Sequence, residues 1–431
     1  MKEYLKMKKI LIISPHFPPS NLAAVHRSRL FARHLPSFGW EPVILTVDEN
    51  YYEENLDWNL HKLLPKELRI EKVKALKVTK PRLVGDIGLR SFYQLRKKAL
   101  QLIRSEKFDF VYIPIPSFYT ALIGPWLKRK TNINFGIDYI DPWVHDFPGS
   151  DNLFSRHWAS SVLAKWLEPK ALKNVSLITG VAEGYYKGVL ERNPNLQKNC
   201  IFGAMPYGGE ASDHEAIKKL AIKPYLFQKE DKILKLVYAG AMLPKAYEPL
   251  EKIFESLKEY KERFNNIQFH FIGTGHSAND AKGYNIKSLA EKYGLWNNMV
   301  YEYPARIPYL DVLVHLEVAD GVFVLGSTEP HYTPSKVYQG VLAQKPILAV
   351  LHTESSAVSV IKNSNAGFVL DFNGTEDLGK LEEQFANRLY DFIHYIPDFK
   401  PEDVDTRFFA QFSAKEVTRK LAGLLDQCYE K

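Results

Sequence analysis

Short apolar runs alternate with amphipathic stretches along the whole chain. The runs are rich in Val, Ile, Leu, Tyr and Phe and are nearly continuous, which predicts strands buried on both faces, as in parallel sheets covered by helices. The predicted strands are Ile10–Ser14, Pro42–Val47, Asp109–Pro114, Phe135–Ile140, Val175–Val181, Leu234–Gly240, Ile267–Gly273, Gly321–Gly326, Pro346–Leu351 and Gly367–Phe372.

A polar, turn-rich stretch follows Met205 and divides these strands into two series. We therefore predict an α/β fold with two doubly wound, Rossmann-like parallel-sheet domains facing a cleft. Their predicted bounds are 1–205 and 233–400, with a linker region over 206–232. Residues 401–431 are predicted to form a C-terminal helix that crosses back to the first domain.

Composition narrows the class of protein. The chain has 431 residues, of which 45% are hydrophobic and 25% charged, the balance of a soluble globular protein. Two cysteines exclude a disulfide scaffold and fit a reducing compartment. No apolar run reaches the ~20 residues that span a bilayer, and Ile10–Ile13 is too short for a signal-peptide core. Secreted, fibrous, disordered and membrane-spanning classes are excluded, and a cytoplasmic location is expected.

The net charge of +7 hides an asymmetry. Residues 1–205 hold 31 Lys and Arg against 19 Asp and Glu, and the remainder holds 26 against 31. A basic front half suggests an anionic partner. Nucleic acid is disfavoured because the chain has no zinc spacing and no recognition-helix signature. An anionic membrane surface or a phosphorylated lipid is also consistent with a basic front half.

Two candidate membrane-binding surfaces are the basic helix Leu89–Arg104 and the residues Phe154, Trp158, Leu163 and Trp166. The alternative is that the basic helix simply packs its apolar face on the sheet.

Two front-half loops carry polar side chains at the carboxyl ends of strands, where ligands bind in open α/β sheets. After the first strand, Ser20 or Asn21 can cap the next helix, and His26 and Arg27 could reach an anion. A capped connector with solvated side chains is the alternative.

The fourth predicted strand is followed directly by Asp141-Pro142-Trp143 and, two residues later, by His145. A carboxylate, an indole and an imidazole form a sugar-binding set, since Trp stacks on pyranose rings. An Asx turn beside a core Trp is the other interpretation.

Back-half loops favour a phosphate ligand. Gly240 permits close backbone approach and Lys245 supplies a charge, although a tight turn with a solvated Lys fits equally. Gly273 and Gly275 follow the next strand and also permit close backbone approach, but a lone G-x-G is weak evidence for a phosphate site.

The stretch from Gly326 to Gln339 is more informative. Here we expect Thr333 to be the helix cap and Pro334 the first helical residue, which places Ser335 and Lys336 in the first turn. A Lys there opposes the helix dipole, which is explained if a phosphate binds beside it. A solvated Lys is again the alternative.

In this order, the motifs ILIISPHFPPS, DYIDPW, YAGAM, FIGTG, TPSKVYQGVLAQKPILA and NAGFVLDF resemble those of GT-B glycosyltransferases, specifically glycosyltransferase family 4 enzymes of bacterial surface-polysaccharide assembly. The resemblance covers nearly the whole chain. It implies that the back domain binds a nucleotide-sugar donor and the front domain an acceptor. It also implies a retaining mechanism without a metal cofactor.

Transferred to this chain, the resemblance places Lys245, Lys336 and Ser335 at the diphosphate, with Gly240 and Gly273 allowing backbone approach. The chain departs from the family at three positions. Gln339 replaces a Glu that binds ribose, His331 replaces a Glu at the donor sugar with Glu329 two positions away, and Ala241 replaces an Arg. These changes affect the choice of donor sugar and the turnover rate more than nucleotide binding.

The leading hypothesis is a retaining, metal-independent glycosyltransferase that moves a sugar to a lipid-linked or polysaccharide acceptor. Catalytic roles would fall to Asp141, His331 and Glu329, and donor binding to Gly240, Lys245, Gly273, Gly275, Thr333, Ser335, Lys336 and Gln339. Acceptor-side candidates are Ser20, Asn21, Arg27, Trp143 and His145. Two rivals remain: a nucleotide-sugar epimerase of the same architecture, and a degenerate binding member of a glycan-assembly complex.

Overall fold

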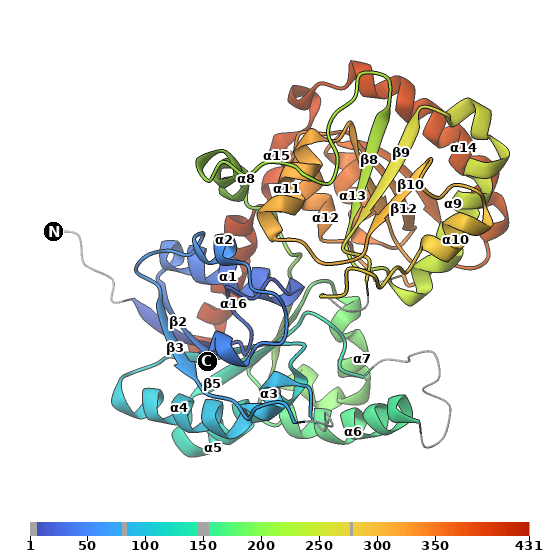
Figure 1. Cartoon of the computed structure of the whole chain (residues 1–431). Coiled ribbons are helices and arrows are strands. Elements are labelled where there is room, and N and C mark those ends of the chain that lie inside the picture. The colour runs from blue at the N-terminus through green and yellow to red at the C-terminus, as the bar shows by residue number, and fades with distance from the viewer. Residues whose placement is uncertain (1–6, 80–83, 145–154, 276–278, 331, 431) are drawn as a thin grey trace. The chain divides into compact units, whose positions relative to one another are not determined.

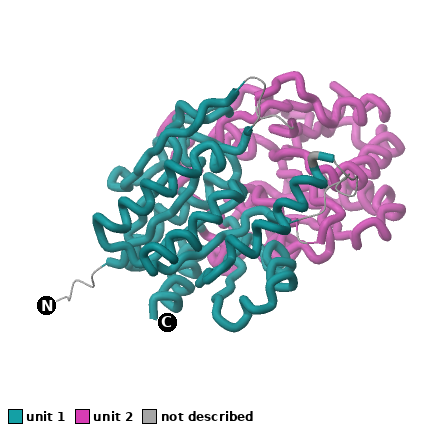
Figure 2. Tube along the Cα trace, turned by 90° about the horizontal axis from the view of Figure 1, so that it is seen from below, with its two compact units in different colours: residues 1–207, 414–431 teal, residues 208–413 magenta. Residues whose placement is uncertain are grey.

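The computed structural model describes residues 7–79, 84–144, 155–275, 279–330 and 332–430. The chain divides into two compact units, shown in Figure 2. Unit 1 contains residues 1–207 and 414–431, and unit 2 contains residues 208–413. Each unit is built around its own parallel sheet (Figure 1).

The sheet of unit 1 has seven strands in the order β3-β2-β1-β4-β5-β6-β7, and all the neighbouring strands pair in parallel. The strands are β1 (Lys8–Ile13), β2 (Trp40–Val47), β3 (Arg69–Val73), β4 (Phe110–Ile115), β5 (Asn134–Tyr139), β6 (Leu177–Gly180) and β7 (Ile201–Ala204). The strand order reverses direction at β1, so β1 and β4 flank the point where ligands bind in such sheets.

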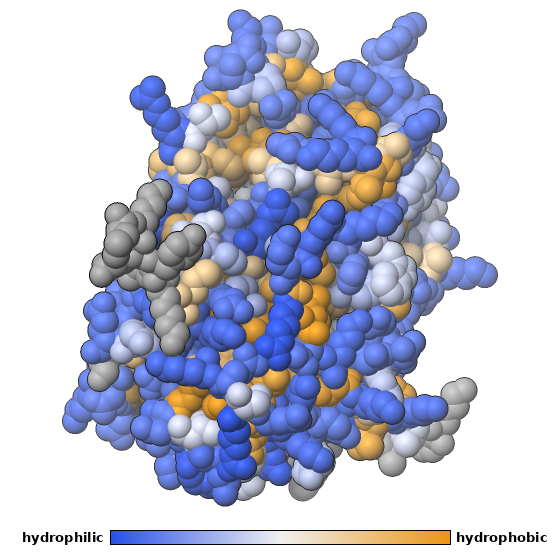
Figure 3. Space-filling model, turned by 90° about the vertical axis from the view of Figure 1, so that its left-hand side faces the viewer, coloured by the Kyte–Doolittle hydropathy of each residue, from blue (hydrophilic) through white to orange (hydrophobic). Residues whose placement is uncertain are grey.

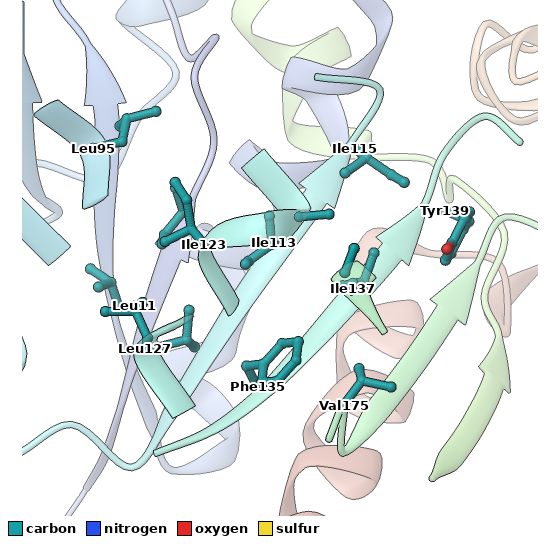
Figure 4. Close-up of a cluster of buried hydrophobic side chains, with 14 of the residues drawn as sticks. Leu11, Leu95, Ile113, Ile115, Ile123, Leu127, Phe135, Ile137, Tyr139 and Val175 are labelled. Carbon is teal, nitrogen blue, oxygen red and sulfur yellow. The ribbon is translucent and has the colours of Figure 1, made fainter. Parts of the chain in front are cut away.

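Both faces of this sheet are buried, which accounts for the continuous apolar runs. In β1, Leu11 and Ile13 join one core cluster while Ile10 and Ile12 join another on the opposite face. Figure 4 shows part of the first cluster, in which Ile113 and Ile137 of neighbouring strands lie among helix side chains such as Ile123 and Leu127.

Helices cover the two faces. Helices α1 and α16 contribute to the cluster with Ile10 and Ile12, whereas α4, α5, α6 and α7 contribute to the cluster with Leu11 and Ile13. The helices of unit 1 are α1 (Ala23–His34), α2 (Trp58–His61), α3 (Ile87–Arg90), α4 (Phe92–Ser105), α5 (Ile123–Thr131), α6 (Arg156–Ala171), α7 (Gly184–Arg192) and α16 (Ala414–Glu430).

The sheet of unit 2 has six parallel strands in the order β10-β9-β8-β11-β12-β13. They are β8 (Leu234–Ala239), β9 (Ile267–Ile272), β10 (Val300–Tyr303), β11 (Gly321–Leu325), β12 (Ile347–His352) and β13 (Gly367–Phe372). The helices are α8 (Ala211–Lys219), α9 (Tyr247–Glu259), α10 (Lys287–Lys292), α11 (Tyr309–Val318), α12 (Lys336–Leu342), α13 (Ser356–Asn363), α14 (Leu378–Tyr395) and α15 (Thr406–Ala410). The prediction of two doubly wound sheets is thus confirmed.

The structure corrects the predicted segment bounds. Most of the expected linker belongs to unit 2, where α8 packs against α11. The expected terminal helix is broken into α15 and α16, because Asp405 caps a separate short helix by accepting bonds from the backbone N–H groups of Arg407 and Phe408. Helix α16 does return to unit 1, as predicted, and there Trp40 Nε1 donates to Asp426 Oδ1 at 2.9 Å.

Candidate functional site

Three loops of unit 2 leave the carboxyl ends of adjacent parallel strands, β9, β8 and β11. Backbone hydrogen bonds hold them together. Gly240 N donates to Ile272 O at 2.9 Å, and Met242 N donates to Thr274 O at 3.2 Å. Thr328 N donates to Lys245 O at 3.1 Å. The fold therefore brings the predicted Gly240–Lys245, Gly273–Gly275 and Gly326–Gln339 segments to one edge of the sheet.

The loop after β9 has the backbone that its two glycines predict. Gly273 has φ +74°, in the left-handed region, and an added Cβ would point into open space. At Gly275 a Cβ would lie 2.8 Å from Pro304 O, which is too close for any side chain. Here the two glycines let the loop turn sharply and approach the neighbouring segment.

Glu302 fixes this loop, a role that the sequence analysis missed. Its buried carboxylate accepts from Thr274 Oγ1 at 2.6 Å, from Asn285 N at 2.8 Å and from Lys287 N at 3.0 Å. A carboxylate with several backbone donors is strongly held. Glu302 therefore joins the β9 loop to the start of α10, and it was missed because it lies in β10, which the apolar pattern did not predict.

Lys245 and Glu329, predicted for donor binding and catalysis, form an ion pair with 3.3 Å between Nζ and Oε1. Both side chains remain partly exposed, at 47% and 30%. Glu329 is further positioned by its backbone N–H, which donates to Ser327 Oγ at 3.2 Å. An incoming phosphate would compete with Glu329 for the Lys245 ammonium group.

Lys336 lies in a different electrostatic environment. Its Nζ is 5.6 Å from the centroid of the Tyr309 ring, and its pKa is lowered to about 8 by burial and by the positive charge of Arg306. No carboxylate of the described residues pairs with it. Arg306 and Tyr309 were missed because they follow β10, a strand that the apolar pattern did not predict. A half-buried ammonium beside a second cation is an arrangement suited to binding an anion.

The helix that begins at this point starts later than predicted. Its first residue is Lys336, and Ser335 occupies the cap position without a side-chain cap bond. The Thr333 hydroxyl does not cap the helix, because its Oγ1 lies 2.8 Å from Ser356 Oγ. Pro334 precedes the helix in a turn closed by the bond from Val337 N to Pro334 O. Thr333 therefore connects the loop to α13.

Gln339 is buried in a polar network with α8 and α11. Its Oε1 lies 3.3 Å from His214 Nε2, and His214 Nδ1 lies 2.8 Å from Glu317 Oε1. A carboxylate only accepts, so His214 donates from Nδ1 to Glu317. One end of the predicted ribose-binding amide thus lies against a histidine ring. His331, another of the three positions that depart from the family, lies outside the described residues.

In unit 1, the structure corrects the expectation for Arg27. Its side chain is fully buried and pairs with Asp138 through two bonds, 2.5 Å from Nε to Oδ2 and 2.9 Å from Nη2 to Oδ1. Nη1 donates to the carbonyl oxygens of Met205 and Pro206. All its charge and most of its donors are used inside the unit, so Arg27 is a structural residue.

Ser20 and Asn21 do not cap α1, whose cap residue is Leu22 and lacks a side-chain cap bond. Instead, the buried Ser20 hydroxyl donates to Glu54, whose Oε1 lies 2.9 Å from His16 Nδ1. The bonds from His16 and Ser20 outweigh burial and lower the pKa of Glu54 to about 2. This network fixes the loop after β1; Asn21 is half-buried beside it.

Trp143 and Asp141 have opposite exposure. The Trp143 ring is buried at 7% exposure and stacks on Phe118 at 5.7 Å between centroids, which is the packing of a core residue and departs from the expected sugar platform. Asp141 is exposed just beyond β5. His145 lies outside the described residues.

No three His, Cys, Asp or Glu side chains among the described residues are grouped so that they could hold a metal ion. Among the same residues, no helix has the length and apolar character needed to cross a membrane.

Neither a known protein family nor a curated protein sequence matches this chain significantly. Solved structures do. A glycosyltransferase from Rickettsia africae matches with TM-score 0.62 and 15% identity over 99% of both chains. Anabaena HepE in complex with UDP-glucose matches with TM-score 0.61 and 11% identity, over 97% of this chain and 99% of HepE. A putative UDP-N-acetylglucosamine 2-epimerase from Listeria monocytogenes matches with TM-score 0.50 and 12% identity, over 98% of this chain and 97% of that one. With these matches and two doubly wound sheets of the same kind, the chain has the GT-B glycosyltransferase fold.

Proposed function

We propose that this protein is a glycosyltransferase whose unit 2 binds a nucleoside-diphosphate sugar. The observation that supports this most directly is the half-buried ammonium group of Lys336 beside Arg306. Taking an ammonium group out of water beside another cation costs free energy, and a bound diphosphate would offset that cost. The solved structures with UDP or UDP-glucose bound share this fold, which supports a nucleotide sugar as the co-substrate.

In this proposal Lys336 and Lys245 hold the diphosphate, and the loop with Gly273 and Gly275 allows its backbone to approach the ligand. The cations replace the charge that a metal ion would supply, so transfer needs no metal cofactor. Gln339 would offer its amide to the ribose. Glu329, paired with Lys245 in the free protein, would be released toward the donor sugar when the diphosphate takes over the ammonium group.

Unit 1 would bind the acceptor, which we propose to be a lipid-linked or polysaccharide glycan. Asp141 is exposed at the carboxyl end of β5, where a carboxylate can orient an acceptor hydroxyl. The proposed reaction retains the anomeric configuration, as the resemblance to family 4 glycosyltransferases implies. Surface-polysaccharide assembly at the cytoplasmic side of a membrane is the corresponding process.

The donor site is tested by measuring nucleoside-diphosphate affinity calorimetrically with EDTA or Mg²⁺ present. We expect UDP, GDP or ADP to bind without metal, and Lys336→Met to weaken binding by about 10- to 150-fold, the value of a charge-assisted bond. Lys345→Met is the matched control, because burial and the charge of Lys229 also lower the pKa of Lys345, whereas the carboxylates of Asp320 and Glu317 act in the opposite direction. Wild-type affinity in Lys336→Met, or an absolute need for Mg²⁺, would refute the phosphate assignment.

An epimerase of the same architecture is the second candidate, supported by the match to the Listeria structure. The substrates that each requires distinguish a transferase, an epimerase and a binding subunit without activity. A transferase consumes nucleotide sugar only with its acceptor, an epimerase isomerises the donor alone, and a binding subunit does neither. Product analysis by NMR with and without a lipid-linked glycan distinguishes all three and reports the anomeric configuration.

A further inference from the structure

Helices α4, α5 and α6 form a continuous layer on one face of the unit 1 sheet. Helix α5 contacts both α4 and α6, and Figure 1 shows the three in a row along that unit. Their inner side chains, such as Leu95, Leu127 and Ala164, belong to one core cluster. Their outer sides are therefore one surface, here called the α4–α6 surface.

This surface carries a large excess of basic residues, of which Lys98 is paired with Glu71 of β3, 2.8 Å from Nζ to Oε2. The described residues of α4 and α5 include no acidic residue, and the only one in α6 is Glu168. Glu168 is buried and accepts from Arg192 Nε and Nη2, both at 2.9 Å. The basic residues are Arg96, Lys97, Lys98 and Arg104 on α4, Lys128, Arg129 and Lys130 on α5, and Lys165 and Lys170 on α6. Lys173 follows just after the end of α6.

The two candidate helices from the sequence differ in what they expose. The apolar face of α4 packs on the core through Leu95, Ala99 and Leu102, so the alternative of an ordinary packed helix holds for α4. Tyr93 remains 61% exposed on its outer side. Phe154 lies outside the described residues, and Trp158 is half-buried.

Helix α6 presents large apolar side chains to solvent. Val162, Leu163 and Trp166 are 47%, 39% and 61% exposed. Helical spacing places Lys170 on the same side, and its ammonium group lies over the Trp166 ring. Figure 3 shows one face of the molecule, on which hydrophobic residues emerge between hydrophilic ones. Exposed apolar residues gathered on one helix indicate a binding surface.

We propose that the α4–α6 surface binds an anionic lipid bilayer, with α6 lying in the plane of the headgroups. Val162, Leu163 and Trp166 would enter the boundary between headgroups and acyl chains, where Trp is favoured. The lysines would contact anionic lipid headgroups through their long stems. A bilayer fits better than a nucleic acid, because aliphatic side chains next to the indole offer no stacking platform for bases.

This inference rests on the proposed function in one respect. A lipid-linked acceptor is held at a membrane, so a transferase that binds the bilayer through unit 1 would meet its acceptor in two dimensions. Donor binding is assigned to unit 2 and has its own assay. The two proposals can therefore fail separately.

The test is flotation of the full chain with liposomes of neutral phosphatidylcholine, with and without about 30 mol% of an anionic phospholipid. We expect recovery with anionic liposomes, loss of recovery at high salt, and little recovery with neutral liposomes. Each lysine removed should weaken partitioning about fivefold, so Lys165→Glu/Lys170→Glu should weaken it by at least about 25-fold. Trp166→Ser should weaken it and abolish a blue shift of tryptophan fluorescence on binding.

Matched controls distinguish an effect of the α4–α6 surface from a general effect of net charge or of exposed apolar residues. Trp58→Ser removes another exposed indole of unit 1, on α2. Lys218→Glu/Lys219→Glu makes the same change of net charge on α8 of unit 2. Both should bind liposomes like wild type. All variants should keep wild-type nucleoside-diphosphate affinity, which shows that they are folded.

Three outcomes would overturn the proposal: no recovery with anionic liposomes, equal recovery with neutral ones, or wild-type recovery of the α6 variants. Retention of an RNA without recovery on liposomes would assign the surface to a nucleic acid instead. If the protein bound liposomes but no nucleotide, membrane binding by the α4–α6 surface would be supported and the proposed donor site would be refuted.

Discussion

Removal of the Arg27 guanidinium from unit 1 is the most direct test of how this unit is held together. In Arg27→Met the side chain keeps its apolar stem but loses the paired charge. The Asp138 carboxylate is then left in the interior, where Thr179 Oγ1, at 2.8 Å, still donates to it. The carbonyl oxygens of Met205 and Pro206 lose their donor as well.

The expected cost follows from burial. Both side chains of the ion pair are fully inaccessible to solvent. Breaking such a pair by removing one partner costs about 3–5 kcal/mol, because the remaining charge is uncompensated. In a unit of this size that corresponds to a fall in melting temperature of about 6–20 °C. Arg69→Met is the control, since Arg69 pairs with Glu71 and Glu106 but is 42% exposed, and such a pair contributes at most about 1 kcal/mol.

Tryptophan fluorescence is the suitable probe for urea denaturation of the full chain. Six of the seven tryptophans lie in residues 1–207, so the signal reports mainly on unit 1. Replacing both partners in Arg27→Met/Asp138→Leu should recover much of the lost stability, because no lone charge remains. A loss below about 1 kcal/mol in Arg27→Met, or a loss of acceptor binding at unchanged stability, would refute the structural role.

Two further predictions concern ligand binding and transfer. Because the pKa of Lys336 is lowered to about 8, the free protein loses this proton as pH rises through that value. Nucleoside-diphosphate affinity should therefore fall above pH 8, and calorimetry at pH 7 and 9 should show a smaller fall in Lys336→Arg, whose side chain keeps its charge. Asp141→Asn should lower the rate of transfer by less than the ~10²–10⁴-fold of a general base, with nucleotide affinity and product anomer unchanged. Full activity of Asp141→Asn would make Asp141 a turn residue, and an inverted product from wild type would contradict the proposed reaction class.

The roles of several side chains could not be predicted from the sequence, because the residues that they contact are distant in the chain. Asp138 stands inside an apolar strand, and a lone carboxylate there requires a partner, but nothing local names Arg27, 111 positions earlier. Trp143 follows a strand end, where a ligand platform was plausible, yet Phe118 covers the ring. In both cases the residue type is unusual for its position in the sequence. The choice between ligand and core depended on the packing of other segments.

The apolar runs by themselves determined the fold class and the central strands of both sheets. A strand buried on both faces needs an apolar residue at nearly every position, and that pattern is local. The strands that the pattern missed were β3, β7 and β10, and each lies at the edge of its sheet. An edge strand has a neighbour on one side only, and β3 and β10 accordingly mix polar with apolar residues.

The sequence also determined which loops leave the strand ends, and the three glycine- and lysine-bearing loops of unit 2 do meet at one edge of the sheet. Only the tertiary structure decided what each charge faces. Lys245 meets Glu329, whereas Lys336 meets Arg306 and Tyr309, although both lysines follow similar strand ends. The free energy of a charged group depends on burial and on neighbouring charges, and segments far apart in the sequence supply both.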